Sequence, residues 1–171
     1  HMAPAQLGLL GLGSSDIDLM IQSHTHIDHV GHLDGFPDAP IVISRAERAL
    51  ERPLYWSGKQ AMEWPERTYI QLDTDTEIGP GFTVLHVPGH APGQLAFLIE
   101  LPDTGTVLIT SDAISRPAEV DEKFAGSWDE AQAIQHGARI LKMAKDRDAW
   151  VIYGHCPDQW PTLRKAPDWY S

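Results

Sequence analysis

Residues 23–29 read Ser-His-Thr-His-Ile-Asp-His. Three histidines and one aspartate fall within six residues of this stretch, directly after the apolar run 17–21. A strand that ends in such a cluster would bring several metal-binding side chains to one point at the edge of a sheet. Imidazole and carboxylate groups together suit divalent metals of the zinc type. The stretch therefore predicts part of a metal site.

The composition is that of a soluble globular protein. The 171 residues are most simply a single domain, residues 1–171, in which His1-Met2 is interpreted as the remnant of an expression tag. Apolar residues make up 42% and charged residues 22% of the chain, which argues against disorder. The net charge of -11 argues against a nucleic-acid partner, because phosphate binding depends on clustered Lys and Arg.

The distribution of cysteine and of apolar residues bears on location. The only cysteine, Cys156, excludes an intramolecular disulfide and fits a reducing compartment, so we expect a cytoplasmic protein. No apolar run approaches the roughly 18 residues of a membrane span, so no membrane association is expected.

The apolar patterns predict short strands, two helices and the turns between them. The expected strands are residues 18–23, 41–44, 76–78, 82–87, 94–101, 106–110 and 149–153. A short helix is expected over residues 45–51, stopped by Pro53. A longer helix is expected over residues 128–145, where apolar residues recur at helical spacing behind an N-capping sequence at 127–130. Strands and helices in this arrangement indicate an α/β or α+β layered fold.

Three further strands end in a possible metal ligand. Each expected strand is followed by a glycine or another small residue and then by His90, Asp112 or His155. With the first cluster, the total is five histidines and two aspartates, too many for one tetrahedral site. Seven ligands fit two metals that share a carboxylate, with water between them.

In this order, the seven ligands resemble the metallo-β-lactamase superfamily, which implies an α+β fold of the αβ/βα sandwich type. The resemblance implies that His24, His26 and His90 hold one metal, while Asp28, His29 and His155 hold the other and Asp112 bridges both. His32, His86 and His136 match no ligand position of the family.

Within the superfamily, residues 87–94 and 154–170 look most like the N-acyl-homoserine lactonases. Their ligand set is shared with glyoxalase II and the tRNA-processing phosphodiesterases, whereas classical β-lactamases commonly lack an equivalent of Asp112. The lactonases usually carry a tyrosine three residues after the bridging aspartate, and Ser115 stands there in this sequence. We therefore expect Ser115 to be a weaker substrate contact.

The resemblance implies two divalent metal ions, with zinc as the expected metal, and a small-molecule substrate. A hydroxide bridging the metals would attack the carbonyl carbon of a homoserine lactone. Asp28 would carry the proton to the ring oxygen and Asp112 would hold the metals, so both are expected to be catalytic. An acyl chain would need an apolar groove, for which the candidates are Leu33, Phe36, Trp56, Met62, Trp64 and Ile114. Packing is the simpler interpretation of the aromatic residues between 55 and 64.

The beginning of the chain departs from the family pattern. Only 23 residues precede His24, whereas the family has a much longer stretch before the histidine cluster. We therefore expect much of the N-terminal half-sheet to be lacking, and a homo-oligomer is one way to complete the core. Two alternatives to the lactonase remain: another hydrolase of the fold (a glyoxalase II-like thioesterase, a broad esterase or a β-lactamase), or a truncated metal-binding homologue without activity.

Overall fold

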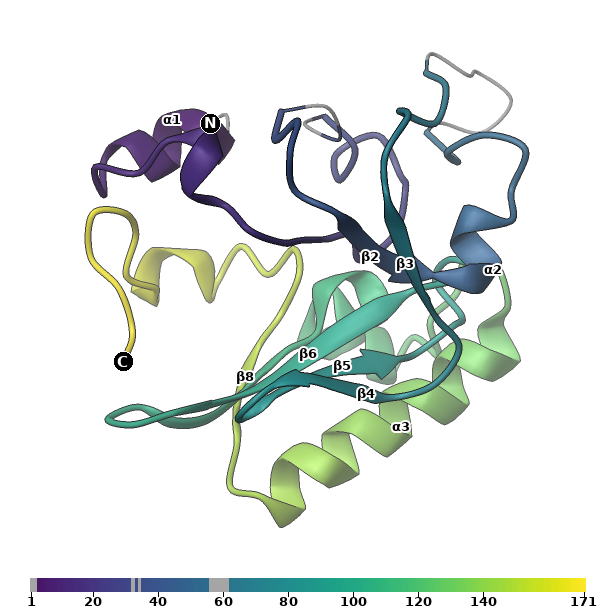
Figure 1. The fold of residues 1–171 in the computed structure, drawn as a ribbon. Helices are drawn as coiled ribbons and strands as arrows, with labels where there is room; N and C mark the ends of the chain where they lie inside the picture. Colours follow the sequence, from purple (N-terminus) through teal and green to yellow (C-terminus); the bar gives the residue numbers. More distant parts are fainter. Residues whose placement is uncertain (1–2, 32, 34, 56–61) are drawn as a thin grey trace.

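The protein contains two β-sheets with helices around them, as a computed structural model that describes residues 3–31, 33, 35–55 and 62–171 shows (Figure 1). The smaller sheet has three parallel strands in the order β1 (Met20–Ile21), β2 (Ile41–Ser44) and β3 (Tyr69–Leu72). The larger sheet has five strands in chain order: β4 (Thr76–Gly79), β5 (Phe82–His86), β6 (Leu95–Leu101), β7 (Gly105–Ile109) and β8 (Trp150–Ile152). Its neighbours are antiparallel except for β7 and β8, which are parallel.

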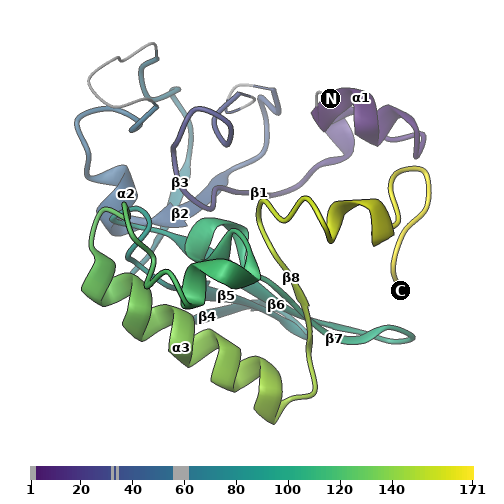
Figure 2. The ribbon, with the colours of Figure 1, turned by 180° about the vertical axis from the view of Figure 1, so that it is seen from behind.

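The helices are α1 (Ala3–Gly8), α2 (Arg45–Arg48) and α3 (Glu130–Asp146), with 3₁₀ turns η1 (Ser14–Asp16), η2 (Ser111–Ile114), η3 (Pro117–Val120) and η4 (Trp160–Thr162). In the view from behind, α1 and the C-terminal segment lie on the same side of the molecule (Figure 2). No helix in the described part of the chain is both long and apolar enough to cross a membrane.

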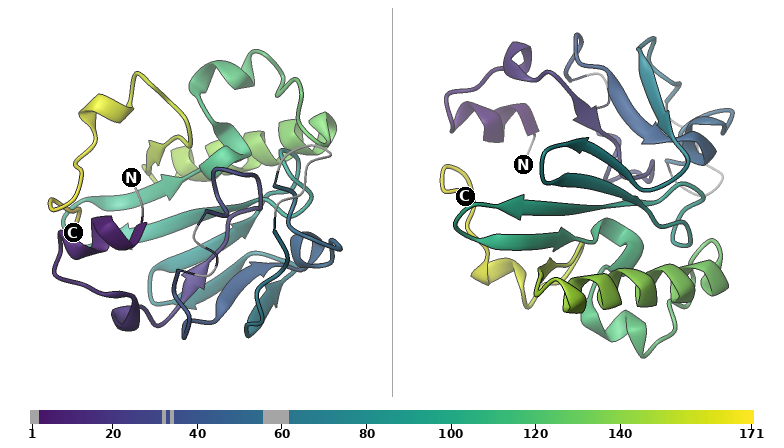
Figure 3. Two further views of the ribbon diagram at one scale, coloured as in Figure 1. Left: turned by 90° about the horizontal axis from the view of Figure 1, so that it is seen from above. Right: turned by 60° about the horizontal axis from the view of Figure 1, so that its bottom comes forward.

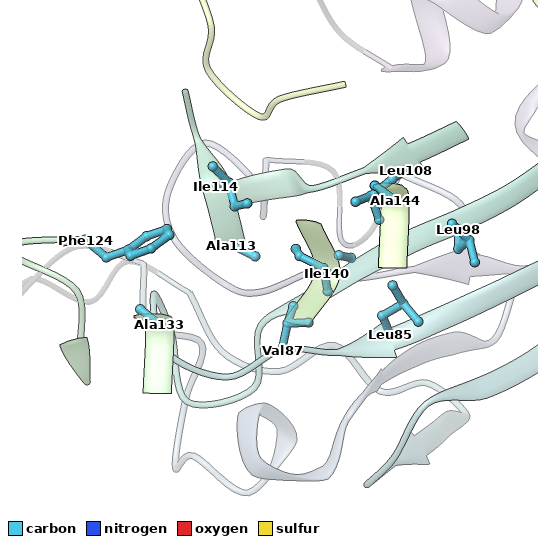
Figure 4. Packing of buried hydrophobic residues seen from close by; sticks show 11 residues of the cluster. Leu85, Val87, Leu98, Leu108, Ala113, Ile114, Phe124, Ala133, Ile140 and Ala144 are labelled. Atoms are coloured by element: carbon cyan, nitrogen blue, oxygen red, sulfur yellow. The ribbon is translucent and has the colours of Figure 1, made fainter. Parts of the chain in front are cut away.

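Helix α3 covers one face of the five-stranded sheet (Figure 3). Asp129 caps its start by accepting a hydrogen bond from the backbone N–H of Gln132 at 3.0 Å. Its buried residues Ala133, Gly137, Ile140 and Ala144 form one stripe at helical spacing. This stripe packs on Leu85, Leu98 and Leu108 of the sheet (Figure 4).

A second apolar layer lies between the two sheets. Val42 of β2 and Leu72 of β3 pack with Val84 of β5 and Leu95 of β6 in one buried cluster. The five-stranded sheet is therefore covered on both faces, by α3 and by the smaller sheet, which is the sandwich arrangement expected from the sequence (Figure 3).

The predicted elements differ from the structure mainly around the smaller sheet. The strand expected over residues 18–23 is reduced to Met20–Ile21, and the helix expected over 45–51 ends at Arg48. Strand β3 and helix α1 were not predicted. The burial pattern of β3 includes two adjacent exposed residues, Ile70 and Gln71, so the sequence lacks the alternation of a half-buried strand. Part of the N-terminal half-sheet is thus present as β1–β3.

Candidate metal centre

The direction of the strands brings the ligand-bearing loops together. Strand β6 is antiparallel to both β5 and β7, and β8 is parallel to β7, so β5, β7 and β8 all run the same way. Their carboxyl ends meet at one edge of the sheet, and they lead into the segments that carry His90, Asp112 and His155. The loop after β1 joins this edge through a hydrogen bond of 2.8 Å from the N–H of Leu95 to the carbonyl of Ser23.

Three histidines form the first ligand group. His24, His26 and His90 each present a ring nitrogen, and these nitrogens lie within 4.8 Å of one another. Nδ1 of His26 and Nε2 of His90 are only 2.9 Å apart. His24 is completely buried.

A second group lies beside the first and contains both aspartates. Asp28, His29, Asp112 and His155 present ligand atoms within 4.8 Å of one another. Nε2 of His155 is 3.2 Å from Oδ2 of Asp28 and 3.2 Å from Oδ2 of Asp112. Nε2 of His29 is 3.2 Å from Oδ1 of Asp112.

Asp112 also contacts the first group. Its Oδ2 lies 3.9 Å from Nε2 of His24 and 3.6 Å from Nε2 of His90. This carboxylate therefore lies between the two groups, where it could serve an ion in either of them. The structure thus brings together all seven of the residues that the sequence predicts as metal ligands.

The unpaired polar atoms of the site fit metal ligation. His24 Nε2, His29 Nε2 and Asp112 Oδ1 are buried and form no well-aligned hydrogen bond among the described residues, although the last two atoms lie 3.2 Å apart. Leaving such atoms unpaired is costly, and buried polar groups normally have a partner. All three belong to the two clusters, and imidazole nitrogen with carboxylate oxygen is a donor set for divalent ions of the zinc type.

The electrostatics keep His24, His90 and Asp112 available as donors, whereas His29 holds a proton more readily than a free imidazole. Burial lowers the pKa of His24 to about 2 and that of His90 to about 4, so both rings are neutral near pH 7 and retain a free lone pair. Burial alone would raise the pKa of Asp112, but the neighbouring His29, His24 and His155 hold it well below its usual range. Burial likewise opposes the charged form of His29, but the Asp112 carboxylate raises its pKa above the ordinary value.

Two glycines allow the close approach of ligand-bearing segments. A Cβ on Gly154 would lie 2.4 Å from the carbonyl oxygen of Ser111 and 3.0 Å from Oδ1 of Asp112. A Cβ on Gly89 would lie 2.4 Å from the backbone nitrogen of Ala133, and Gly89 has a φ of +150°. Any larger side chain at these two positions would push Asp112 or the His90 loop away from the site.

Two buried polar residues that the sequence did not single out brace the histidine loop. The side-chain amide of Gln22 donates to the carbonyl of His24 and, at 2.9 Å, to that of His29. The carboxylate of Glu47 accepts hydrogen bonds from Thr25, between two of the ligands. Neither Gln22 nor Glu47 lies in a metal-ligand sequence pattern. Their supporting role is therefore evident only from their burial and their hydrogen-bond partners in the structure.

Ser115 lies beside a ligand. Its carbonyl accepts a hydrogen bond of 2.8 Å from the N–H of His155, and its own N–H donates to Oε2 of Glu119 at 2.6 Å. This places Ser115 next to the second group, and a contact with substrate stays a prediction.

The acyl groove predicted from the sequence is wrong for three of its residues. Leu33, Phe36 and Ile114 are buried in the hydrophobic core, where Leu33 packs with Ile41 and Ile43 of β2 and Ile114 packs in the cluster under α3. Met62 and Trp64 pack against the buried cluster that includes Ile41 and Ile43 of β2, which supports the packing interpretation. Trp56 and His32 lie outside the described residues. His86 and His136 belong to neither ligand group.

A cavity of about 410 Å³ adjoins His155 instead. Its lining residues all come from the segment that follows β8: Tyr153, Gly154, His155, Cys156, Pro157, Gln159, Trp160 and Leu163. The Trp- and Pro-rich composition of this segment was the available signal in the sequence.

Comparison with known proteins places this site in a family. Residues 1–155 match the family model described as the metallo-beta-lactamase superfamily. N-acyl homoserine lactonase AttM of Agrobacterium fabrum is 31% identical in an alignment of 182 positions. The alignment covers 97% of this chain and 68% of AttM. N-acyl homoserine lactonase AiiA of Bacillus thuringiensis subsp. kurstaki is 31% identical over 164 residues, covering 94% of this chain and 64% of AiiA.

The fold agrees with solved structures. An N-acyl homoserine lactone hydrolase with the product N-hexanoyl-L-homoserine bound at its catalytic metal centre superimposes with a TM-score of 0.84 at 30% identity. The match covers 96% of this chain and 66% of that one. The chain therefore belongs to the metallo-β-lactamase superfamily. Its relatives within the family include N-acyl homoserine lactonases, and it spans about two thirds of their length.

Proposed function

We propose that this protein is a metal-dependent hydrolase that opens the lactone ring of N-acyl homoserine lactones. The observation that carries the proposal is the position of Asp112, which lies within 3.9 Å of a histidine nitrogen in both ligand groups. Two groups joined by one carboxylate suit a pair of ions and the hydrolytic chemistry that such pairs support. The lactonase relatives make a lactone the first substrate to test.

The ligand set suits two divalent ions, and we propose zinc. His24, His26 and His90 would hold one ion, Asp28, His29 and His155 the other, and Asp112 both. Such ions supply a water of lowered pKa and a Lewis acid for the carbonyl oxygen. The neutral rings of His24 and His90 leave their lone pairs available near pH 7.

Asp28 is placed to move a proton. Half of its side chain is exposed, while its Oδ2 lies 3.2 Å from Nε2 of His155 and 3.6 Å from Nε2 of His29. A carboxylate at the open side of the site can take a proton from the attacking water at Oδ2 and return it to the ring oxygen that leaves. Asp112, by contrast, is 7% exposed, and its role is to hold the two groups at a fixed separation.

The cavity beside His155 offers apolar surface for the substrate. Pro157, Trp160 and Leu163 contribute to its lining, and His155 belongs to both the cavity and the ligand set. An acyl chain extending from the second group would therefore find apolar side chains within reach. A polar contact between Ser115 and the same substrate is part of the proposal, since the Ser115 carbonyl accepts a hydrogen bond from the N–H of His155.

The proposal is tested by loading the purified protein with zinc and measuring acid release from N-hexanoyl-homoserine lactone, with and without EDTA. We expect turnover that EDTA removes and added zinc restores. A panel with an acyl thioester and a β-lactam distinguishes a lactonase from another hydrolase of the fold. Absence of lactone turnover in protein that binds two equivalents of zinc would contradict the proposal and favour an inactive metal-binding homologue.

A homo-oligomer stays part of the proposal. Strand β1 is at the edge of the smaller sheet and pairs only with β2 among the described strands. Sedimentation velocity measures the subunit number directly, and a monomer with full activity would show that no second copy is needed.

A further inference from the structure

Glu47 is a buried carboxylate that the proposed chemistry does not use. It lies on α2, it is 0% exposed, and Glu47 and Asp112 are the buried acidic residues in the described part of the chain. No ion pair with Lys or Arg is found for Glu47 among the described residues. A charge buried without such a partner is expensive, so its position calls for a specific reason.

The two carboxylate oxygens of Glu47 join two ligand-bearing loops. Oε1 accepts hydrogen bonds from the N–H of Thr25 at 2.8 Å and from its hydroxyl at 2.5 Å, while Oε2 accepts one from the N–H of Gly93 at 3.1 Å. Thr25 lies between His24 and His26, and Gly93 follows His90 by three residues. The carboxylate thus spans the two loops that supply the whole three-histidine group.

The groups around Glu47 present hydrogen-bond donors to both of its carboxylate oxygens. The N–H of Leu54 donates to the hydroxyl oxygen of Thr25 at 2.8 Å, which leaves the hydroxyl hydrogen free to point at Glu47. A Cβ on Gly93 would lie 2.6 Å from the Cβ of Glu47, so only glycine permits this approach. A glutamine in place of Glu47 would set its NH₂ group against a donor, the N–H of Thr25 or that of Gly93.

We propose that Glu47 is a positioning residue, which holds the loops of His24, His26 and His90 in register and raises the affinity of this group for a divalent cation. The inference rests on the metal site of the proposed function. Outer partners of this kind fix the orientation of ligands, and their loss typically lowers metal affinity.

The proposal is tested with E47Q, which keeps the size of the side chain and removes one acceptor and the charge. Zinc affinity is measured by competition with a chromogenic chelator, and the stability of the metal-free protein by urea unfolding. The zinc affinity of the three-histidine group is expected to fall about tenfold to a hundredfold. Two controls accompany it: E77Q changes an exposed glutamate, and I140V weakens a buried core position on α3.

The controls separate positioning from general stability. I140V is expected to lower the urea midpoint without changing zinc affinity, whereas E77Q should change neither. Zinc binding by E47Q equal to that of the unaltered protein would overturn the proposal, and so would equal losses of affinity in E47Q and I140V. If metal-free E47Q does not fold, T25V removes the hydroxyl donor while leaving the carboxylate in place, and undiminished zinc affinity in T25V overturns the proposal.

The zinc measurement needs no lactone. A protein whose zinc affinity depends on Glu47 but which hydrolyses no lactone would support the role of Glu47 and contradict the proposed function. The two proposals therefore fail by different results.

Discussion

The two ligand groups differ in how deeply they lie in the molecule. In the three-histidine group, His24 is completely buried and the side chain of His90 is 27% exposed. In the second group, Asp28 and His155 are 50% and 49% exposed, although Asp112 and His29 lie deeper, at 7% and 20%. Glu47 accepts hydrogen bonds from the loops that carry the three-histidine group. The second group is open to solvent at His155, beside the cavity at the C-terminal segment.

This difference indicates a division of work between the groups. A group whose His24 and His90 rings are neutral and whose loops are held by buried hydrogen bonds changes little when substrate arrives, so it suits the retention of an ion. A half-exposed carboxylate and imidazole can reach substrate and exchange protons with water. We therefore expect substitutions in the two groups to separate ion binding from turnover.

The largest effect is expected from the residue that touches both groups. Asp112→Asn removes the charge that lies between the groups and keeps the shape of the side chain. Zinc affinity should fall by more than the roughly 100-fold that the loss of an outer partner costs, because a direct ligand is changed. Zinc content after gel filtration, measured by atomic emission, tests this. Full zinc content in D112N would break the view that one carboxylate joins the groups.

The next effect concerns the exposed group alone. Asp28→Asn should lower kcat by about 10²- to 10⁴-fold, since it removes a proton carrier, while the three-histidine group keeps its ion. Kinetics on a homoserine lactone and zinc titration of the same sample test the two halves of this expectation. D121N changes another exposed aspartate and is the matched control. A loss of zinc from the three-histidine group in D28N would contradict the division of work.

A third test changes the close contact of Gly154 with Ser111 and Asp112. Gly154→Ala places a Cβ 2.4 Å from the carbonyl oxygen of Ser111, so we expect about 1–3 kcal/mol of destabilisation and weaker zinc binding. Gly79→Ala is the control, because a Cβ there would meet no atom within 4 Å. Urea unfolding with and without zinc measures both effects, and equal behaviour of the two variants would show that Asp112 can shift without cost.

The smallest effect is on the pH dependence of the metal-free protein. The pKa of His90 is lowered to about 4 in the folded protein by burial, against an ordinary value of 6.5. As pH falls from 6.5 towards 4, the unfolded chain takes up this proton and the folded protein does not, so stability falls by about 1.4 kcal/mol per pH unit for this group.

Urea unfolding of the metal-free protein between pH 4.5 and 6 tests the slope, with His90→Gln as the comparison. The variant should lose stability less steeply as the pH falls, because it lacks the group that titrates only in the unfolded chain. An unchanged slope would show that His90 is less well buried than the structure indicates.

The ligand chemistry was accessible from the sequence. Histidine and aspartate side chains stand within three residues of the ends of four apolar segments, and strand ends gather at sheet edges whatever the details of packing. The strands expected over residues 41–44, 82–87 and 106–110 and the helix over 128–145 lie close to the observed elements, because their apolar spacing is regular. Local pattern and donor type together predicted the class of site.

Burial was not accessible in the same way. Leu33, Phe36 and Ile114 were expected to line a groove because they lie near ligands in the sequence, but the structure buries them in the core. An apolar side chain near a site satisfies either role locally, and only the neighbouring layers decide between them.

The sequence by itself determined which atoms can bind metal and in which order along the chain they come. The tertiary structure alone decided how these atoms are held. Glu47 binds Thr25, which is 22 positions away in the chain, and Gly93, which is 46 positions away. Gly154 packs against Ser111, which follows a different strand. Such contacts depend on the packing of both sheets, and the spacing of residues along the chain carries no record of them.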